Sequence, residues 1–103
     1  MYVDDVLISL AHRPMTAKLV RCFFNATEQY LSKERLIKEV YQVDFDGLSP
    51  RMKHSLSQNL VKLVSRSRSF LRGASDLHGL QTKVDWFYFD RGLEKWTLYR
   101  ENL

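Results

Sequence analysis

The chain has 103 residues, 45% of them hydrophobic, and a formal net charge of +4. This composition supplies enough apolar material for one folded core and excludes an intrinsically disordered chain. No apolar run approaches the roughly 20 residues of a membrane helix, and the first residues lack the basic-then-apolar pattern of a secretory signal. We therefore expect a cytoplasmic protein with no membrane partner.

The residue types that carry most catalytic and metal chemistry do not form a motif here. Cys22 is the only cysteine and lies in an apolar run, so we expect a buried packing thiol. The three histidines, His12, His54 and His78, lack the spacing of metal ligands. No nucleophile motif or phosphate loop is present either. The sequence predicts no enzyme activity, no catalytic residue, no metal and no cofactor.

The positive charge is concentrated in one part of the chain. Residues 47–75 contain six Lys and Arg and no acidic residue. Residues 1–46 hold six basic against seven acidic residues, and residues 76–103 hold four against five. An anionic partner is therefore expected to meet the central segment.

Residues 3–10 predict a short strand that ends at the turn-prone segment 12–14. Residues 16–26 then carry apolar side chains at a spacing of three to four, which predicts a helix with one buried stripe. The members of this stripe are Leu19, Val20, Phe23 and Phe24.

The next two helices are predicted from their N-terminal caps. Ser32 can cap a helix of about ten residues whose apolar side carries Leu36, Ile37, Val40 and Tyr41. Ser49 is a favoured cap for a third helix, and Pro50 suits its first position. Gly73 predicts the end of this helix.

The C-terminal residues predict a β-hairpin. After a small and polar connection over residues 73–82, the aromatic segment 84–89 predicts one strand and residues 95–99 the other, joined by a turn at 90–94. The expected fold class is α+β: a short N-terminal strand, three helices and a C-terminal β-hairpin, forming one domain over residues 1–103.

Helical periodicity divides residues 49–72 into two faces. The apolar face carries Met52, Leu56, Leu60, Leu63, Val64, Phe70 and Leu71. The opposite face carries Arg51, His54, Ser55, Gln58, Lys62, Ser65, Arg66, Arg68, Ser69 and Arg72. The exceptions are Lys53 and Ser67 on the apolar side and Val61 on the polar side.

The polar face suits duplex DNA. Lys and Arg gain affinity for DNA by releasing its condensed counterions, whereas a carboxylate would oppose binding. Shorter polar side chains, such as His54, Ser55 and Gln58, could reach base edges in the major groove. A simple solvated face is the alternative, but such helices normally mix both charge signs.

Three segments resemble the OmpR/PhoB-type DNA-binding domains of bacterial response regulators. Residues 30–41 are similar to the family's second helix, with its Ser cap, acidic residue, Leu and Val-aromatic pair. Residues 54–63 are similar to its recognition helix, and residues 91–98 to its Arg-Gly hairpin. The resemblance covers roughly residues 15–100. Only about 14 residues precede the first helix, so the family's four-stranded N-terminal sheet is reduced here to one or two strands.

The resemblance implies a winged helix-turn-helix fold and transcription regulation through double-stranded DNA. The third helix would enter the major groove and the hairpin 84–100 would act as the wing. The DNA-binding residues would be Arg51, His54, Ser55, Gln58, Lys62, Arg66, Arg68, Arg91 and Lys95. It also implies RNA polymerase as a partner and a homodimer on tandem half-sites. The chain would stand alone or be the C-terminal effector piece of a longer regulator.

Two alternatives follow from other residues. An exposed Val61 and acidic flanks favour a winged-helix module that binds an acidic protein partner. The aromatic residues of the hairpin suggest stacking on single-stranded nucleic acid, although one face of a hairpin must cover the helices, so we expect most of these rings in the core.

Overall fold

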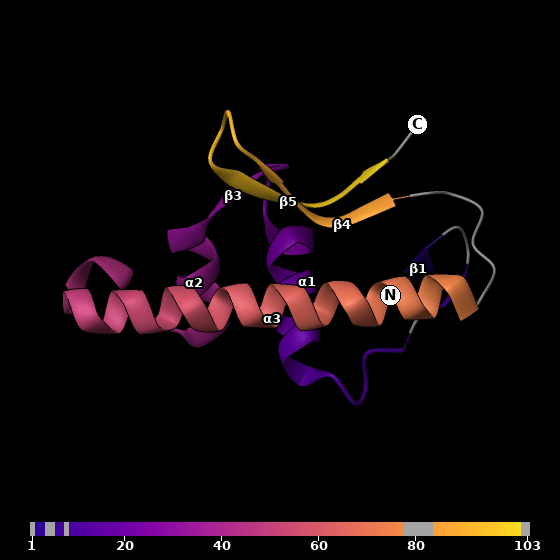
Figure 1. The fold of residues 1–103 in the computed structure, drawn as a ribbon, viewed down its shortest axis with the longest axis horizontal. Helices are drawn as coiled ribbons and strands as arrows, with labels where there is room; N and C mark the ends of the chain where they lie inside the picture. Colours follow the sequence, from indigo (N-terminus) through magenta and orange to yellow (C-terminus); the bar gives the residue numbers. More distant parts are fainter. Residues whose placement is uncertain (1, 4–5, 8, 78–83, 102–103) are drawn as a thin grey trace.

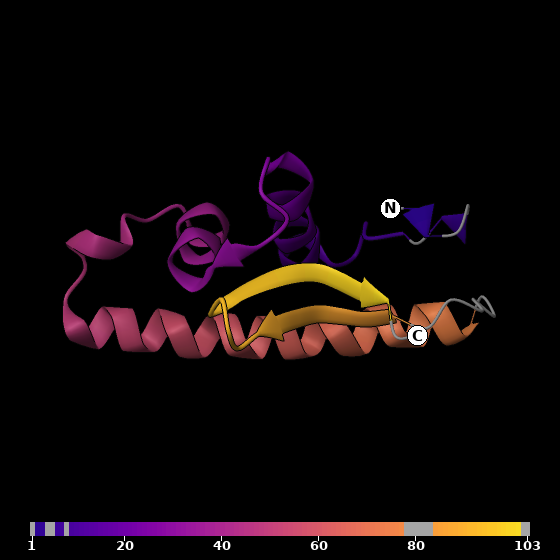
Figure 2. The same cartoon turned by 90° about the horizontal axis from the view of Figure 1, so that it is seen from above.

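The computed structural model describes residues 2–3, 6–7, 9–77 and 84–101, and the side chains of residues 9–74 and 86–99. Within these ranges the protein is α+β with three α-helices, as the sequence predicted, and its main sheet has three antiparallel strands where only a two-stranded hairpin was predicted. Helix α3 (Pro50–Leu77) runs along the whole molecule, while α1 and α2 cross it on one side (Figures 1 and 2). None of the described helices is both long and apolar enough to cross a lipid bilayer.

The N-terminal segment differs from the prediction. In place of one strand over residues 3–10, β1 (Tyr2–Val3) pairs antiparallel with β2 (Val6–Leu7) in a separate two-stranded sheet. Residues 4, 5 and 8 of the predicted strand lie outside the described residues. The sequence between the two strands holds two aspartates, a residue type depleted in strands.

Helix α1 (Pro14–Asn25) begins with proline at its first position and buries Leu19, Val20 and Phe23. Phe24 was predicted on the same stripe but is 62% exposed, because it lies at the edge of the stripe near the helix end. Cys22 is half-buried rather than buried, and its Sγ donates to the Lys18 carbonyl at 3.1 Å.

Helix α2 (Lys33–Tyr41) starts where the sequence predicted. The Ser32 Oγ accepts from the Arg35 N–H at 3.2 Å, which satisfies one of the free donors of the first turn. Just before it, β3 (Leu31–Ser32) pairs with the C-terminal hairpin. A short 3₁₀ turn, η1 (Phe45–Gly47), then connects α2 to α3.

Helix α3 begins at Pro50 as predicted, with the Ser49 Oγ accepting from the Met52 N–H at 3.3 Å. The predicted end at Gly73 is wrong, because the helix continues to Leu77. Gly73 is exposed, whereas the following Ala74 packs against the core and favours another helical turn. Of the predicted connection 73–82, residues 78–82 lie outside the described residues.

The main sheet has the strand order β3-β5-β4. Strands β4 (Val84–Asp90) and β5 (Lys95–Glu101) form the predicted hairpin, closed by the pair Asp90 and Lys95. Phe87 has a φ of 52°, a left-handed conformation that is rare for a bulky residue. This conformation interrupts the alternation of buried and exposed side chains along the strand, so that the neighbours Trp86 and Phe87 are both buried.

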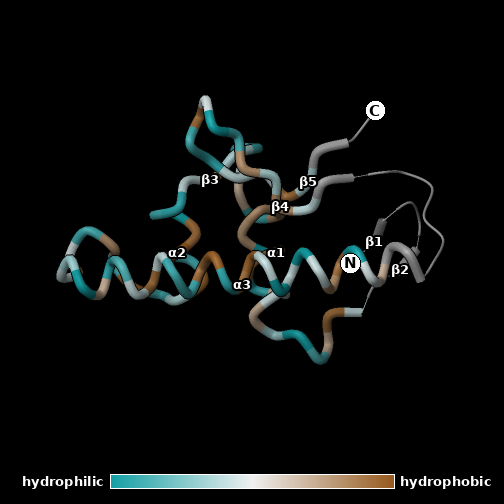
Figure 3. The backbone as a smooth tube through the Cα atoms, viewed as in Figure 1, coloured by the Kyte–Doolittle hydropathy of each residue, from teal (hydrophilic) through white to brown (hydrophobic). Residues whose placement is uncertain are grey.

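The core lies where α1, α2 and the sheet meet the middle of α3, and hydrophobic positions gather there (Figure 3). Leu60, Val64 and Leu71 of α3 are buried as predicted. Met52 was expected on the buried face but is 49% exposed, because the first turns of α3 project past α2 (Figure 2). Among the hairpin aromatics, Trp86 and Phe87 are buried, Tyr88 and Trp96 are half-buried, and Phe89 and Tyr99 are exposed.

Candidate nucleic-acid interface

The solvent face of α3 carries most of the predicted binding residues. Every one of Arg51, His54, Ser55, Gln58, Lys62 and Arg66 is exposed, as are Ser65, Ser69 and Arg72 between and beyond them. The helix contains no acidic residue from Pro50 to Ser75, and Asp76 is its first. At neutral pH this face therefore carries the positive charges of Arg51, Lys62, Arg66 and Arg72 and no negative charge up to Ser75.

Arg68 does not belong to this face. Its Nε donates to the Trp86 carbonyl and its Nη2 to the Phe87 carbonyl, each at 2.9 Å. The left-handed φ of Phe87 lies between these two carbonyls, and the guanidinium joins both of them to α3. Arg68 was predicted to contact DNA, but in the structure its side chain links α3 to β4 through these two hydrogen bonds.

Ser67 is a polar residue that helical periodicity placed on the apolar face, and it is fully buried. Its Oγ lies 2.8 Å from the Thr16 Oγ1 in α1, which is also buried. Each hydroxyl satisfies the other, so neither is left unpaired in the core. This bond fixes the first turn of α1 against α3.

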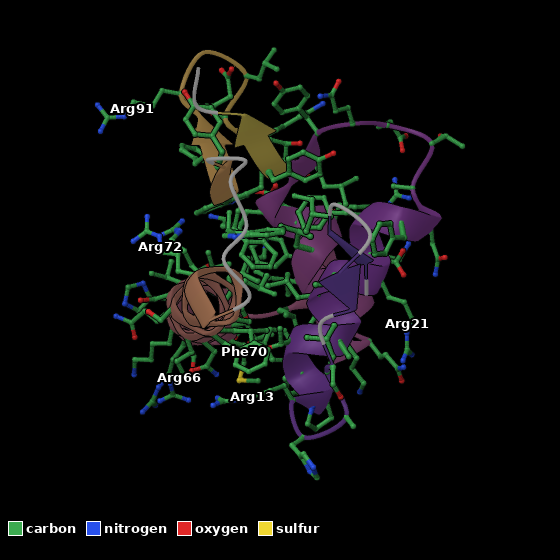
Figure 4. All side chains as sticks on the ribbon, turned by 90° about the vertical axis from the view of Figure 1, so that its right-hand side faces the viewer. Arg13, Arg21, Arg66, Phe70, Arg72 and Arg91 are labelled. Atoms are coloured by element: carbon green, nitrogen blue, oxygen red, sulfur yellow. The ribbon has the colours of Figure 1, made fainter. Side chains whose placement is uncertain are left out.

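Lys62 and Arg66 line a cleft of about 500 Å³ between α3 and the segment that precedes α1. His12 and Arg13 line its opposite wall. The Arg13 guanidinium carbon lies 4.8 Å from the centre of the Phe70 ring, and Arg66, Arg13 and Phe70 lie on the same side of α3 (Figure 4). Four basic side chains from two distant segments thus meet in one place.

The first half of α3 presents polar side chains around the exposed apolar side chain of Val61. His54, Gln58, Val61 and Lys62 line a shallow depression together with Ser57. Val61 is 59% exposed, as its position on the polar face predicted. Lys53, the other exception, is half-buried, and its Nζ lies 5.4 Å from the centre of the Phe45 ring.

The predicted hairpin residues, Arg91 and Lys95, are exposed at the turn between β4 and β5. Arg91 lines a surface cleft that also contains Glu34 and Glu94, so its charge is partly balanced. In Figure 4, Arg91 and Arg72 lie on the other side of α3 from Arg66 and Arg13. The predicted residues Arg66 and Arg91 therefore lie on opposite flanks of α3.

Acidic side chains gather on α2 and the segment before it. Arg35 forms ion pairs there with Glu28 at 3.7 Å and Glu39 at 3.6 Å. A backbone N–H and the Arg35 guanidinium hold the pKa of Glu28 below its usual range. Among the side chains that the structure describes, no carboxylate pairs with Lys62 or Arg66.

Sequence reasoning missed His12, Arg13 and Tyr41, which all line the cleft beside Lys62 and Arg66. Burial raises the pKa of the Tyr41 hydroxyl, which keeps it a proton donor at neutral pH. The sequence feature that could have indicated His12 and Arg13 is their position directly before Pro14, at the start of a helix with no acidic residue in its first turn.

In comparisons with known proteins, no protein-family model, curated protein or solved structure matches this chain.

Proposed function

We propose that this protein is a double-stranded DNA-binding regulator with a winged-helix layout, in which α3 enters the major groove. The observation that carries this proposal is the solvent face of α3, which exposes four basic residues without a carboxylate from Pro50 to Ser75. The element order, with β3 between α1 and α2 and a hairpin after α3, supports the layout.

The shape of α3 supports docking in the major groove. A helix with its side chains is about 10–12 Å across, and the major groove of B-DNA is about 12 Å wide. The 28 residues of α3 span about 42 Å at a rise of 1.5 Å per residue, which makes the helix more than one DNA turn long. A helix of this length can follow the curved groove over only some of its turns.

The two flanks of α3 would face the two strands of the duplex. Lys62, Arg66 and Arg13 lie on one flank, and Arg72 and Arg91 on the other (Figure 4). These residues would contact phosphates and set affinity, because phosphate contacts carry no sequence information. His54, Ser55 and Gln58, on the exposed face of the N-terminal half of α3, are the proposed base readers.

The test is a fluorescence anisotropy titration of a mixed-sequence duplex at several salt concentrations. Each phosphate contact contributes about 0.9 to the slope of log K against log salt, so at 0.1 M salt two contacts account for roughly a 60-fold gain in affinity. We expect Lys62→Gln with Arg66→Gln to lose about that factor and to reduce the slope by about two.

The matched control is Lys18→Gln with Arg21→Gln, which removes the same charge from exposed positions on α1. Arg21 lies on the far side of the molecule from α3 (Figure 4). Equal losses in both variants would show only a response to net charge and would contradict the proposal.

The exposed Val61 in its apolar depression favours a second candidate, a module that binds an acidic protein. Under this alternative, wild-type protein would fail to bind any duplex at low salt. Binding of an acidic polypeptide such as poly-glutamate would then depend on Lys62 and Arg66 and also on Val61, since Val61→Ser removes an apolar contact.

A further inference from the structure

We infer that the cleft between residues 12–16 and α3 is a phosphate-binding site, in which His12 and Arg13 add one backbone-phosphate contact to those of Lys62 and Arg66. This inference rests on the proposed function and adds a second segment of the chain to the interface. The cleft has a volume of about 500 Å³, which is ample for a phosphate group and its first hydration waters.

The charge of the cleft selects an anion. His12 and Arg13 line one wall and Lys62 and Arg66 the other, and none of the described lining residues is acidic. Lys62 and Arg66 are one helical turn apart on α3, so their side chains extend side by side. Without an anion, these like charges repel one another across the cleft, and a phosphate would remove that repulsion.

Arg13 makes a contact within the protein that holds its side chain beside the cleft. The carbon at the centre of its guanidinium lies 4.8 Å from the centre of the Phe70 ring, a cation–π contact that favours this position of the exposed side chain. A planar guanidinium can donate two parallel hydrogen bonds to a phosphate. The contact with Phe70 reduces the side-chain freedom that is lost on binding.

The two walls are also held at a fixed separation. The buried hydrogen bond between Thr16 and Ser67 joins the first turn of α1 to α3 directly beneath the cleft. The Asn59 amide and the protonated Tyr41 hydroxyl add neutral donors to the lining. The site is therefore assembled before any ligand arrives.

The shape of the cleft favours a phosphodiester over a carboxylate. A phosphate offers oxygens in several directions at once and can accept from both walls, whereas a carboxylate presents two oxygens in one plane. A backbone phosphate beside α3 is also where the strand flanking the major groove would run if α3 occupies that groove. The duplex would thus be held by a segment that lies about 50 residues before Lys62 in the sequence.

The experiment compares His12→Gln with Arg13→Gln against the control Arg21→Gln, which removes the same formal charge, in the duplex titration. All three residues are exposed, so thermal unfolding should change little in both variants beyond the loss of the contact between Arg13 and Phe70. We expect the cleft variant to lose about eightfold in affinity at 0.1 M salt, and its slope to fall by about one. Arg13→Lys should keep most of the slope, because it retains the charge.

Inorganic phosphate provides an independent readout. Titrated into ¹⁵N-labelled wild-type protein, it should shift the amide signals of residues 15–16 and 59–66 in a saturable way, and the cleft variant should not respond. If the duplex binds with Lys62 and Arg66 but the cleft variant keeps the wild-type slope, the phosphate site is refuted and the proposed function stands.

If no duplex binds, the proposed function fails and the phosphate titration decides about the cleft alone. Saturable shifts confined to the cleft would support a free anion site, and their absence would refute it.

Discussion

Replacing Arg68 by methionine separates two roles that the sequence could not distinguish. In the structure the guanidinium donates to the carbonyls of Trp86 and Phe87, each at 2.9 Å. Methionine fills a similar volume but makes neither bond. We therefore expect Arg68→Met to weaken the attachment of β4 to α3.

The magnitude follows from the two lost bonds. A hydrogen bond with a charged partner contributes about 1.5–3 kcal/mol, and the half-buried position of Arg68 lets water replace part of it, so we take the lower value. The two bonds together give a loss of about 3 kcal/mol in the free energy of unfolding. With a urea m-value of about 1.5 kcal/mol/M, the unfolding midpoint should fall by about 2 M.

The matched variant is Arg66→Met, two residues away and exposed. It should change the free energy of unfolding by less than about 0.5 kcal/mol, but lower duplex affinity about eightfold at 0.1 M salt. Urea unfolding and the salt titration should thus show opposite patterns for the two arginines. If Arg68→Met keeps the wild-type urea midpoint and lowers the dependence of duplex affinity on salt, then Arg68 contacts DNA. Its hydrogen bonds to the carbonyls of Trp86 and Phe87 would then not form in solution.

Four further predictions concern stability and reactivity. Gly73→Ala should stabilise the protein by about 0.5–1 kcal/mol in urea unfolding, because Gly73 is inside α3 and an added Cβ meets nothing within 4 Å; destabilisation would instead indicate a helix end. Ser67→Ala should cost about 1–3 kcal/mol by leaving the buried Thr16 hydroxyl unpaired, and a cost below 0.5 kcal/mol would contradict the bond. Ser32→Ala should cost about 1 kcal/mol through loss of the α2 cap, measured as a lower thermal midpoint. Burial and the nearby Glu39 raise the pKa of Cys22, so iodoacetamide should alkylate it more slowly at pH 8 than in the urea-unfolded chain; equal rates would place the thiol in water.

The raised pKa of Cys22 also gives a sign for stability against pH. The unfolded thiol ionises at lower pH than the folded one, so the stabilising contribution is complete below the unfolded pKa. It is lost as pH rises through the folded pKa. Cys22→Ala should flatten this alkaline decline.

Local patterns in the sequence determined where α2 and α3 begin and most of the positions that they bury, whereas α1 begins at Pro14, two residues before the predicted start. Ser32 and Ser49 cap α2 and α3 as predicted, because a cap needs only a side-chain oxygen and the N–H groups of the next turn. The period of α3 correctly assigned Leu60, Val64 and Leu71 to the core. The exposed basic arc of the candidate interface follows from the same period.

Other features depended on contacts between distant segments. The two-residue strand β3 carries too little pattern to be recognised, and exists because β5 pairs with it. The sequence placed Ser67 on the apolar side of α3 and Arg68 on the polar side, but it gave a partner for neither. The first is buried by Thr16, 51 residues away, and the second is held by carbonyls 18 and 19 residues away.

The candidate interface shows the same division. The sequence by itself determined a long helix with a basic, acid-free face, since helical geometry places side chains by their spacing alone. Only the tertiary structure decided that Arg68 turns inward and that His12 and Arg13 join Lys62 and Arg66. Packing of α1 against α3 brings these segments together, and that packing depends on the shapes of both helices rather than on either sequence pattern.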